Sequence, residues 1–170
     1  MTPPLLHIVA LALCEDDLRA VRAFIRRHLR PEGRTLDLGC GPGLFADLFA
    51  DLFAGGDYVG IDPRARFVDY ARRRRPGAFL CEELAPVALP AGRFDQALAF
   101  DALGPRSDAA GRTILAELRR LLAPGGRALI IERAAAAERV ARLVPALGRI
   151  EKREDLKSGV RNRVGTLVGC

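Results

Sequence analysis

Short apolar runs alternate along the chain with segments whose apolar residues recur three or four positions apart. Such runs are typical of buried strands, and the second spacing is typical of amphipathic helices. The runs predict strands over residues 34–38, 57–62, 78–81, 94–100, 127–132, 148–156 and 161–168. The helical spacing predicts helices over residues 16–30, 44–53, 64–75, 108–122 and 134–147, besides a first helix that includes the apolar run 5–13.

This alternation predicts the class of fold. A strand followed by a helix and a second strand is the unit of α/β proteins, whose parallel sheets carry helices on both faces. Only Lys157-Ser158-Gly159 separates the last two strands, and it reads as a hairpin turn. We therefore expect a Rossmann-like, doubly wound, mostly parallel seven-stranded sheet with an antiparallel C-terminal hairpin. Residues 1–170 are expected to form a single domain, with the helices of residues 1–33 packed on its core.

A glycine-rich loop joins the first strand to the next helix. The sequence Asp37-Leu38-Gly39-Cys40-Gly41-Pro42-Gly43 ends the strand, and Leu44 opens the helix. Glycines let the backbone approach a ligand without a Cβ in the way, and a helix N-terminus offers unpaired N–H groups. The loop therefore predicts a site for part of a nucleotide.

An acidic residue follows this loop at an informative distance. Asp62 closes the second strand 21 positions after Gly41, where a carboxylate can accept both hydroxyls of a ribose. The alternative is that Asp62, which precedes Pro63, only caps the next helix. The loop and the acid occur together, so we favour ribose binding. Leu44 stands where a dinucleotide-binding loop has its third glycine, which counts against NAD.

The charge and the cysteines narrow the function further. The chain has 27 basic and 21 acidic residues, a net charge of +6, and its only lysines are Lys152 and Lys157. We interpret the arginine-rich helix faces as solvated surface. Cysteines occur at four scattered positions, which argues against a metal site or disulfide framework and fits a cytoplasmic protein. The apolar run 5–13 is too short to span a bilayer and lacks the features of a signal peptide.

Four segments, in order, resemble the class I S-adenosylmethionine-dependent methyltransferases in their small single-domain form. They are Leu36-Asp37-Leu38-Gly39-Cys40-Gly41-Pro42-Gly43, Tyr58-Val59-Gly60-Ile61-Asp62, Leu89-Pro90-Ala91-Gly92-Arg93-Phe94-Asp95, and Leu118-Arg119-Arg120-Leu121-Leu122-Ala123-Pro124-Gly125-Gly126-Arg127. Four motifs in sequence are far more specific than any one of them. The resemblance covers residues 34–132, and the terminal hairpin fits the family's last two strands.

The resemblance implies S-adenosylmethionine as the cofactor, S-adenosylhomocysteine as the product, and a role for each matching residue. The methionine end would lie against Asp37, Gly39, Cys40 and Gly41. Asp62 would hold the ribose hydroxyls and Pro63 would lie against the adenine. The acid after the third strand would accept a hydrogen bond from the adenine amino group. It is assigned to Glu83, with Leu84 beside it in the adenine site, although the spacing also allows Glu82. Phe100 would form a wall near the sulfonium.

Transfer of the methyl group by direct displacement needs mainly alignment and exclusion of water, so a catalytic base is optional. Asp101, just past the fourth strand, is the candidate for a base or substrate anchor, and a loop-capping role is the alternative. Motifs of the base-methylating and ribose-methylating enzymes are missing, so we expect a small-molecule acceptor. Three alternatives stay open: an RNA or protein acceptor, a lipid or quinone acceptor, and cofactor binding without transferase activity. A homodimer also stays open.

Overall fold

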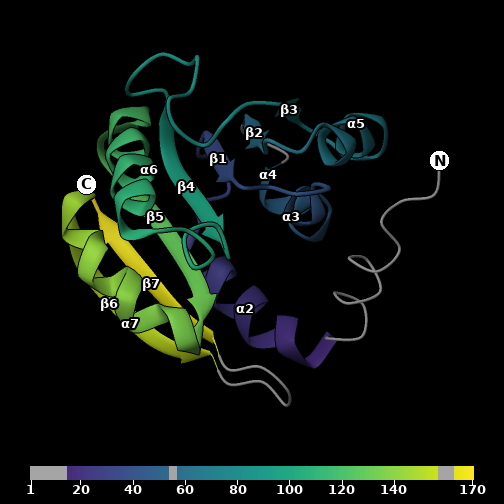
Figure 1. The fold of residues 1–170 in the computed structure, drawn as a ribbon. Helices are drawn as coiled ribbons and strands as arrows, with labels where there is room; N and C mark the ends of the chain where they lie inside the picture. The colour runs from purple at the N-terminus through teal and green to yellow at the C-terminus, as the bar shows by residue number, and fades with distance from the viewer. Residues whose placement is uncertain (1–14, 54–56, 157–162) are drawn as a thin grey trace.

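The computed structural model describes residues 15–53, 57–156 and 163–170. Its centre is a seven-stranded sheet in the order β3-β2-β1-β4-β5-β7-β6 (Figure 1). The strands are β1 (Thr35–Leu38), β2 (Tyr58–Ile61), β3 (Ala78–Leu80), β4 (Phe94–Phe100), β5 (Leu122–Arg133), β6 (Arg149–Leu156) and β7 (Arg163–Gly169). The first five strands pair in parallel, whereas β7 is antiparallel to both β5 and β6. The expected sheet, with its antiparallel hairpin, is confirmed.

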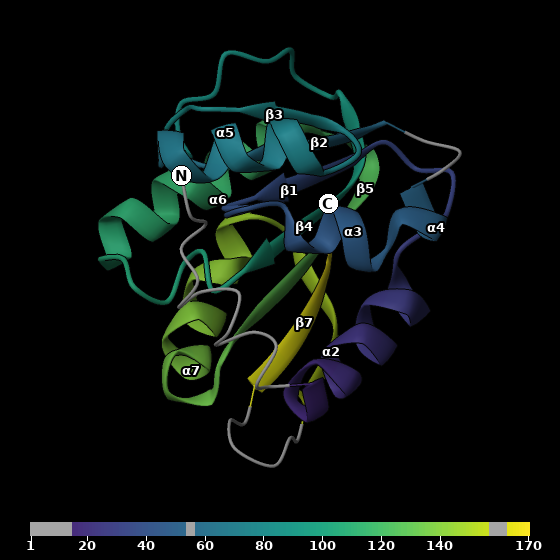
Figure 2. The ribbon, with the colours of Figure 1, turned by 90° about the vertical axis from the view of Figure 1, so that its right-hand side faces the viewer.

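Helices cover both faces of this sheet. They are α2 (Glu15–His28), α3 (Leu44–Leu48), α4 (Ala50–Phe53), α5 (Ala65–Arg74), α6 (Asp108–Leu121) and α7 (Ala134–Leu143), which continues into a 3-10 turn (Val144–Ala146). On one face α6 and α7 pack with the apolar side chains of one core cluster. On the other face α2 to α5 enclose a second cluster rich in phenylalanine, and Figure 2 views the molecule from that side. The apolar faces predicted from the helical spacing are therefore the buried ones.

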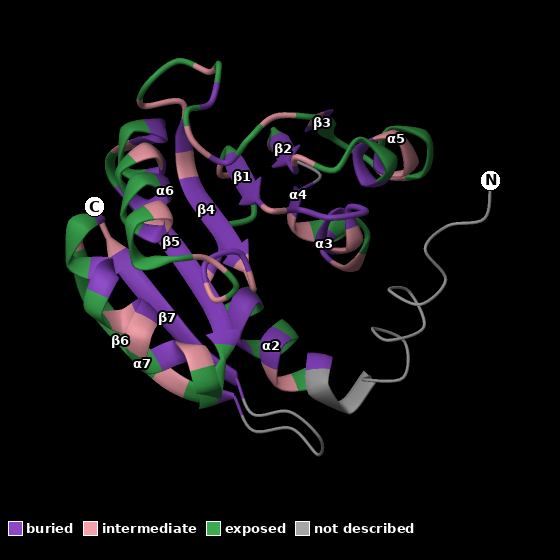
Figure 3. Cartoon of the chain, viewed as in Figure 1, coloured by how far each residue is buried: buried purple, intermediate pink, exposed green. Residues whose placement is uncertain are grey.

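The central strands are buried and the β6 edge is not. Every residue of β1 and β2 is buried, as expected for strands with helices on both sides (Figure 3). On β6 only Leu156 is fully buried. Charged side chains on an exposed edge strand discourage pairing with another sheet. The β6 edge is therefore protected by charge, and the ends of the buried central strands are the part of the sheet where a ligand site is expected.

Three elements depart from the sequence prediction by more than two residues or by a break. The helix expected over residues 134–147 ends at Leu143, and the chain continues as the 3-10 turn Val144–Ala146. The helix expected over residues 44–53 is interrupted at Phe49, whose φ of −127° and ψ of 27° are not helical. Phe49 is fully buried between the rings of Phe45 and Phe53, so packing of three aromatic rings outweighs helix continuity. Strand β5 begins at Leu122, five residues before the expected start, and therefore includes the Pro-Gly-Gly sequence.

No helix within residues 15–53, 57–156 and 163–170 is long and apolar enough to cross a membrane. The helix expected around the apolar run 5–13 lies outside the described residues.

Candidate functional site

A cavity of about 570 Å³ opens at the carboxyl ends of β1, β2 and β4. The strand order reverses here, because β1 lies between β2 and β4, and ligands of open α/β sheets bind at such points. The lining comes from six segments and two strand ends: residues 39–42, 44–45, 62–64, 84, 100–102 and 105–106, with Arg133 and Arg163. Its size is typical of a site for a small molecule or cofactor.

The glycine loop forms one wall of the cavity. Gly41 and Gly43 both have positive φ angles, but a side chain at each position would meet different surroundings. Gly41 has a φ of +56°, and a Cβ built there would meet only Arg64 Nη2, at 3.9 Å. Its backbone therefore faces open cavity. Gly43 has a φ of +74°, and its Cβ would come within 2.9 Å of the Phe79 ring. Gly43 thus allows close packing against Phe79 of β3, whereas Gly41 leaves room for a ligand.

Asp62 lies at the end of β2, faces the glycine loop and is only 1% exposed. Its Oδ2 accepts a hydrogen bond from the Gly41 N–H at 2.9 Å, and its Oδ1 accepts one from the Arg64 N–H at 2.9 Å. The Arg64 guanidinium donates to both oxygens, at 2.8 and 2.7 Å. Burial by itself would raise the pKa of Asp62, but these donors hold the pKa below its usual value. Asp62 is therefore an ionised carboxylate at the cavity wall.

Asp37 lies beneath the glycine loop and is not among the residues that line the cavity. The Tyr58 hydroxyl donates to its Oδ2, and its Oδ1 has no hydrogen-bond partner among the described residues. Burial raises the pKa of Asp37 to about 7. The pair joins β1 to β2 just below the loop, so Asp37 supports the wall that Gly39 and Gly41 form.

Cys40 lines the cavity but is a packed thiol. Its Sγ would lie 2.8 Å from a Cβ at Gly60, so the side chain sits against the bare backbone of β2. Burial raises the pKa of the thiol far above its usual value, which disfavours the reactive thiolate.

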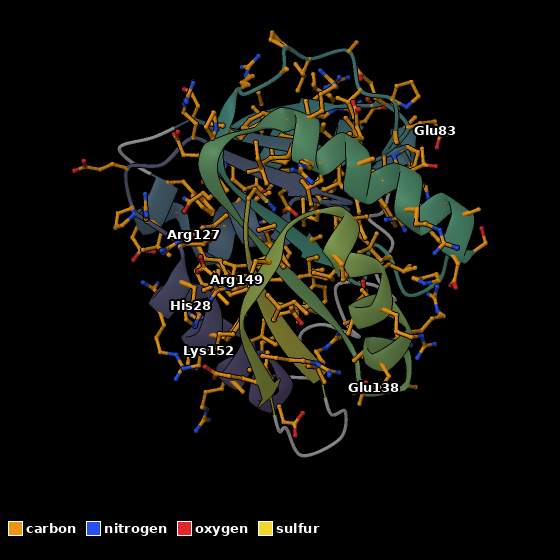
Figure 4. All side chains as sticks on the ribbon, turned by 90° about the vertical axis from the view of Figure 1, so that its left-hand side faces the viewer. His28, Glu83, Arg127, Glu138, Arg149 and Lys152 are labelled. Carbon is orange, nitrogen blue, oxygen red and sulfur yellow. The ribbon has the colours of Figure 1, made fainter. Side chains whose placement is uncertain are left out.

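The segment after β3 contributes Leu84 but no acid. Leu84 is buried and lines the cavity. Glu83 is exposed and lies at the edge of the molecule (Figure 4), and Glu82 accepts a hydrogen bond from the Ala88 N–H at 2.9 Å. Neither glutamate is a lining residue.

The loop after β4 closes the other end of the cavity with Phe100 and Asp101. Asp101 has a φ of +49°, rare for a residue other than glycine. Its Oδ1 accepts a hydrogen bond from Arg163 Nη1 at 2.6 Å, and its Oδ2 lies 3.4 Å from Arg133 Nε. The Arg163 guanidinium lies 4.2 Å above the centre of the Phe100 ring, within the range of a cation–π contact. Both carboxylate oxygens of Asp101 are thus paired with arginine.

A buried glutamate fixes this loop from below. Glu132 is 2% exposed, and its two oxygens accept the N–H groups of Leu103 and Gly104, at 2.9 and 3.1 Å. Burial raises the pKa of Glu132 to about 7. A Cβ on Gly104 would come within 2.5 Å of one of these oxygens, so the contact requires glycine.

The structure brings together eight of the ten predicted site residues along one cavity: Gly39, Cys40, Gly41, Asp62, Pro63, Leu84, Phe100 and Asp101. Asp37 and Glu83 are not lining residues. Four residues of this site were not predicted from the sequence: Arg106, Arg133, Arg163 and the supporting Glu132. A sequence signal was available for Glu132, because a charged residue that directly follows the apolar run Ala128–Ile131 is expected to be buried with a specific partner. In the described part of the chain no three His, Cys, Asp or Glu side chains gather closely enough to hold a metal ion.

Residues 35–126 match the family model described as a methyltransferase domain. The match covers more than half of the chain, and the chain therefore belongs to this family. Together with the seven-stranded sheet it confirms the resemblance to the class I S-adenosylmethionine-dependent methyltransferases.

Individual relatives agree with this assignment. The probable methyltransferase ltbC of Aspergillus luteorubrus is 31% identical over 118 residues, which are 61% of this chain and 41% of that protein. The chain spans less than half the length of the curated relatives that it matches.

Two solved structures share the fold. An S-adenosylmethionine-dependent methyltransferase from Aquifex aeolicus superposes with a TM-score of 0.77 at 16% identity, covering 99% of both chains. The Burkholderia thailandensis 1,6-didemethyltoxoflavin-N1-methyltransferase, solved with bound 1,6-didemethyltoxoflavin and S-adenosylhomocysteine, gives a TM-score of 0.72 at 22% identity, covering 91% of this chain and 78% of that one.

Proposed function

We propose that this chain carries an S-adenosylmethionine-dependent methyltransferase activity. The observation that carries the proposal is the placement of the Asp62 carboxylate against the Gly41 N–H, beside open cavity. A buried, ionised acid at the end of β2 fits a ribose, and the bare backbone of Gly41 fits the close approach of a ligand. Family membership supports the same chemistry.

The lining residues fit the parts of this cofactor. Asp62 would accept the ribose hydroxyls, and Pro63 and Leu84 offer apolar surface for the adenine. The loop of residues 39–41 would hold the methionine end, and Phe100 would wall the cavity beside the sulfur. Asp37 would act through Tyr58 and the loop rather than by contact. Glu83 would need a different side-chain position to reach the adenine.

When bound, S-adenosylmethionine supplies an electrophilic methyl group for direct displacement by an acceptor atom. The chain's own residues then need to align the acceptor and keep water out. Phe100 and Ala102 provide apolar wall at this end of the cavity. We assign Asp101 the role of holding Arg163 and Arg133 in place, because each of its oxygens is engaged by one of these side chains and neither is free to remove a proton.

We propose that the acceptor is a small molecule. The end of the cavity near Phe100 is lined by Pro105, Arg106, Arg133 and Arg163, and the volume of the whole cavity, about 570 Å³, suits a small molecule beside the cofactor. We also propose a cytoplasmic protein whose residues 1–170 fold as one domain, on the grounds of its scattered cysteines and continuous α/β pattern.

Calorimetric titration of the purified chain with S-adenosylmethionine and S-adenosylhomocysteine tests the proposal, with NAD as the control ligand. We expect both sulfur nucleosides to bind and NAD not to bind. Asp62→Ala should weaken binding at least tenfold, because two charge-assisted hydrogen bonds are lost. Asp69→Ala, which removes a half-exposed carboxylate on α5, is the matched control and should leave binding unchanged. Failure of a folded sample to bind either nucleoside would overturn the proposal.

A further inference from the structure

Three arginine side chains line the end of the cavity beyond β4. Arg106 comes from the loop between β4 and α6, Arg133 is the last residue of β5, and Arg163 is the first residue of β7. We call these three residues the arginine cluster. The proposed cofactor contacts lie along the glycine loop and Asp62 and use none of them. The cluster therefore needs its own explanation.

The register of the sheet places two of these arginines directly opposite each other. Arg133 and Arg163 are partners across the antiparallel pair β5 and β7. Like charges at opposed positions repel and destabilise a sheet. Asp101 lies between the two guanidiniums and pairs with both, at 2.6 and 3.4 Å. One carboxylate thus serves two cations, and positive charge remains in excess.

Counting the ionisable side chains of the lining gives the same result. The lining contains four arginines, at positions 64, 106, 133 and 163, and two aspartates, Asp62 and Asp101. Arg64 and Asp62 neutralise each other at the far end of the cavity. Among the lining side chains, the excess of two positive charges therefore lies at the arginine cluster. Glu132, behind the lining, interacts with Arg163 and offsets part of this charge when it is ionised.

Two members of the cluster are held in place before any ligand arrives. The Arg163 side chain is only 8% exposed and is fixed by Asp101 and by the Phe100 ring. Arg106 donates from Nε to the Ala102 carbonyl at 2.9 Å, which orients its guanidinium. The Arg133 side chain is 61% exposed and can adapt. Groups that are ordered in advance lose less entropy on binding, which favours affinity.

We propose that the arginine cluster binds an oxyanion of the methyl acceptor, so that the substrate class is a small compound with a carboxylate or phosphate group. This inference rests on the proposed function. A guanidinium presents parallel N–H donors that match the oxygens of either group. Such an anion completes the charge balance that Asp101 alone leaves unfinished. Asp101 is then a positioning residue that holds Arg163 and Arg133 toward the cavity.

The position of the cluster favours a small anion over a nucleic acid. A protein that follows a phosphate backbone uses a stripe of exposed basic residues. Here Arg163 is buried, and the three arginines converge on one cavity with an acid between them. A single oxyanion fits this arrangement better than a chain of phosphates.

The same geometry predicts coupling between acceptor and cofactor. Excess positive charge near Phe100 disfavours the positively charged sulfonium of S-adenosylmethionine relative to the neutral sulfur of S-adenosylhomocysteine. An anion in the cluster removes this penalty. The anion should therefore strengthen the binding of S-adenosylmethionine more than that of S-adenosylhomocysteine, and the coupling is reciprocal.

The test is calorimetry of the full chain at low ionic strength, with succinate as the carboxylate probe, inorganic phosphate as the phosphate probe and succinamide as the neutral control. A single-stranded RNA oligonucleotide is the nucleic-acid arm. The cluster variant is the double substitution Arg106→Gln with Arg133→Gln, which spares the buried Arg163. The control is the same double substitution at Arg127 and Arg149, which Figure 4 labels. Both arginines lie opposite Gly169, at the other end of β7 from Arg163.

We expect succinate or phosphate to bind the native chain, to bind the cluster variant at least tenfold more weakly and to bind the control variant as well as the native chain. The bound anion should also raise the affinity for S-adenosylmethionine several-fold. Equal anion binding by both variants, equal binding of succinamide, or binding of RNA alone would overturn the inference. If S-adenosylhomocysteine still binds in those cases, the proposed function stands. Absence of S-adenosylhomocysteine binding would overturn both.

Discussion

The guanidinium of Arg64 donates hydrogen bonds to both oxygens of the Asp62 carboxylate, from Nε to Oδ1 at 2.8 Å and from Nη2 to Oδ2 at 2.7 Å. These are the oxygens that a ribose would use. The Arg64 guanidinium also lies 4.1 Å above the Phe67 ring. Its side chain is 49% exposed, so water can solvate the guanidinium once it leaves Asp62. A ligand that takes Asp62 has to displace this guanidinium.

Removal of the competing guanidinium should therefore improve cofactor binding. A half-exposed ion pair contributes about 0.5–1 kcal/mol, so Arg64→Met should tighten the binding of S-adenosylhomocysteine about two- to fivefold. Calorimetry measures the change. Arg66→Met removes a neighbouring exposed arginine that also lies over Phe67, and it should have no effect. Weaker binding by Arg64→Met would show instead that Arg64 contacts the ligand.

Alanine substitutions at two glycines with similar positive φ angles distinguish an effect on ligand binding from an effect on stability. Gly41→Ala and Gly92→Ala both place a Cβ at positive φ, +56° and +66°, at a cost of about 1–2 kcal/mol each. The Cβ at Gly41 projects into the cavity, whereas none of the described atoms lies within 4 Å of a Cβ at Gly92. Both variants should lose similar stability in urea, but only Gly41→Ala should lose S-adenosylhomocysteine binding. Equal binding by the two would remove Gly41 from the proposed site.

The buried Glu132 should give the protein a pH-dependent stability. The pKa of its carboxyl is raised from 4.5 to about 7 in the folded chain, so between these values the folded state binds more protons than the unfolded state. The stability contributed at this position therefore falls as the pH rises from 4.5 to 7. The melting temperature of the native chain relative to Glu132→Gln should be higher at pH 5 than at pH 8. A difference that is constant with pH would contradict this prediction.

The hydroxyl group of Tyr58 should by itself make a measurable contribution to the stability of the fold. Tyr58→Phe leaves a buried carboxylate oxygen of Asp37 without its donor, which costs about 1–3 kcal/mol of unfolding free energy. Tyr70→Phe, on α5, is the matched control and should change stability little. Urea denaturation compares the two. Replacing Asp37 by Asn in the Tyr58→Phe background should recover part of the loss, because the buried group is then uncharged.

Local pattern was sufficient to predict the sheet. A buried strand must be apolar and a helix must present one apolar face, so the elements appear in the sequence almost as they fold. The glycine loop and Asp62 were found for a similar reason, since they are close in sequence and their spacing reflects a single β-α-β unit. The break at Phe49 was not foreseen, because it depends on how three rings pack together.

The basic end of the cavity depends on contacts between distant parts of the chain. Arg163 meets Asp101 across 62 positions, and Glu132 holds a loop 28 to 29 positions away. An arginine in the sequence gives no sign of whether it faces water or a cavity. Only the arginine-rich helix faces were interpreted, as solvated surface, and the arginines of the cavity received no role. Arg64, two residues from Asp62, was overlooked for the same reason. The segment after β3 was correctly predicted to reach the cavity, but the side chain that lines it is Leu84 and not the acidic Glu83.

The position of β7 between β5 and β6 has a consequence for how the protein is made. β6 precedes β7 in the chain, yet only β7 pairs with β5. During synthesis, the hydrogen-bonding edge of β5 therefore remains unpaired until residues 163–169 have left the ribosome. Asp101 lacks its Arg163 partner over the same interval. Pairings between distant segments form slowly. A nascent chain stalled before residue 163 would expose the apolar edge of β5 to its neighbours on the polysome, and chaperone demand should concentrate at that stage.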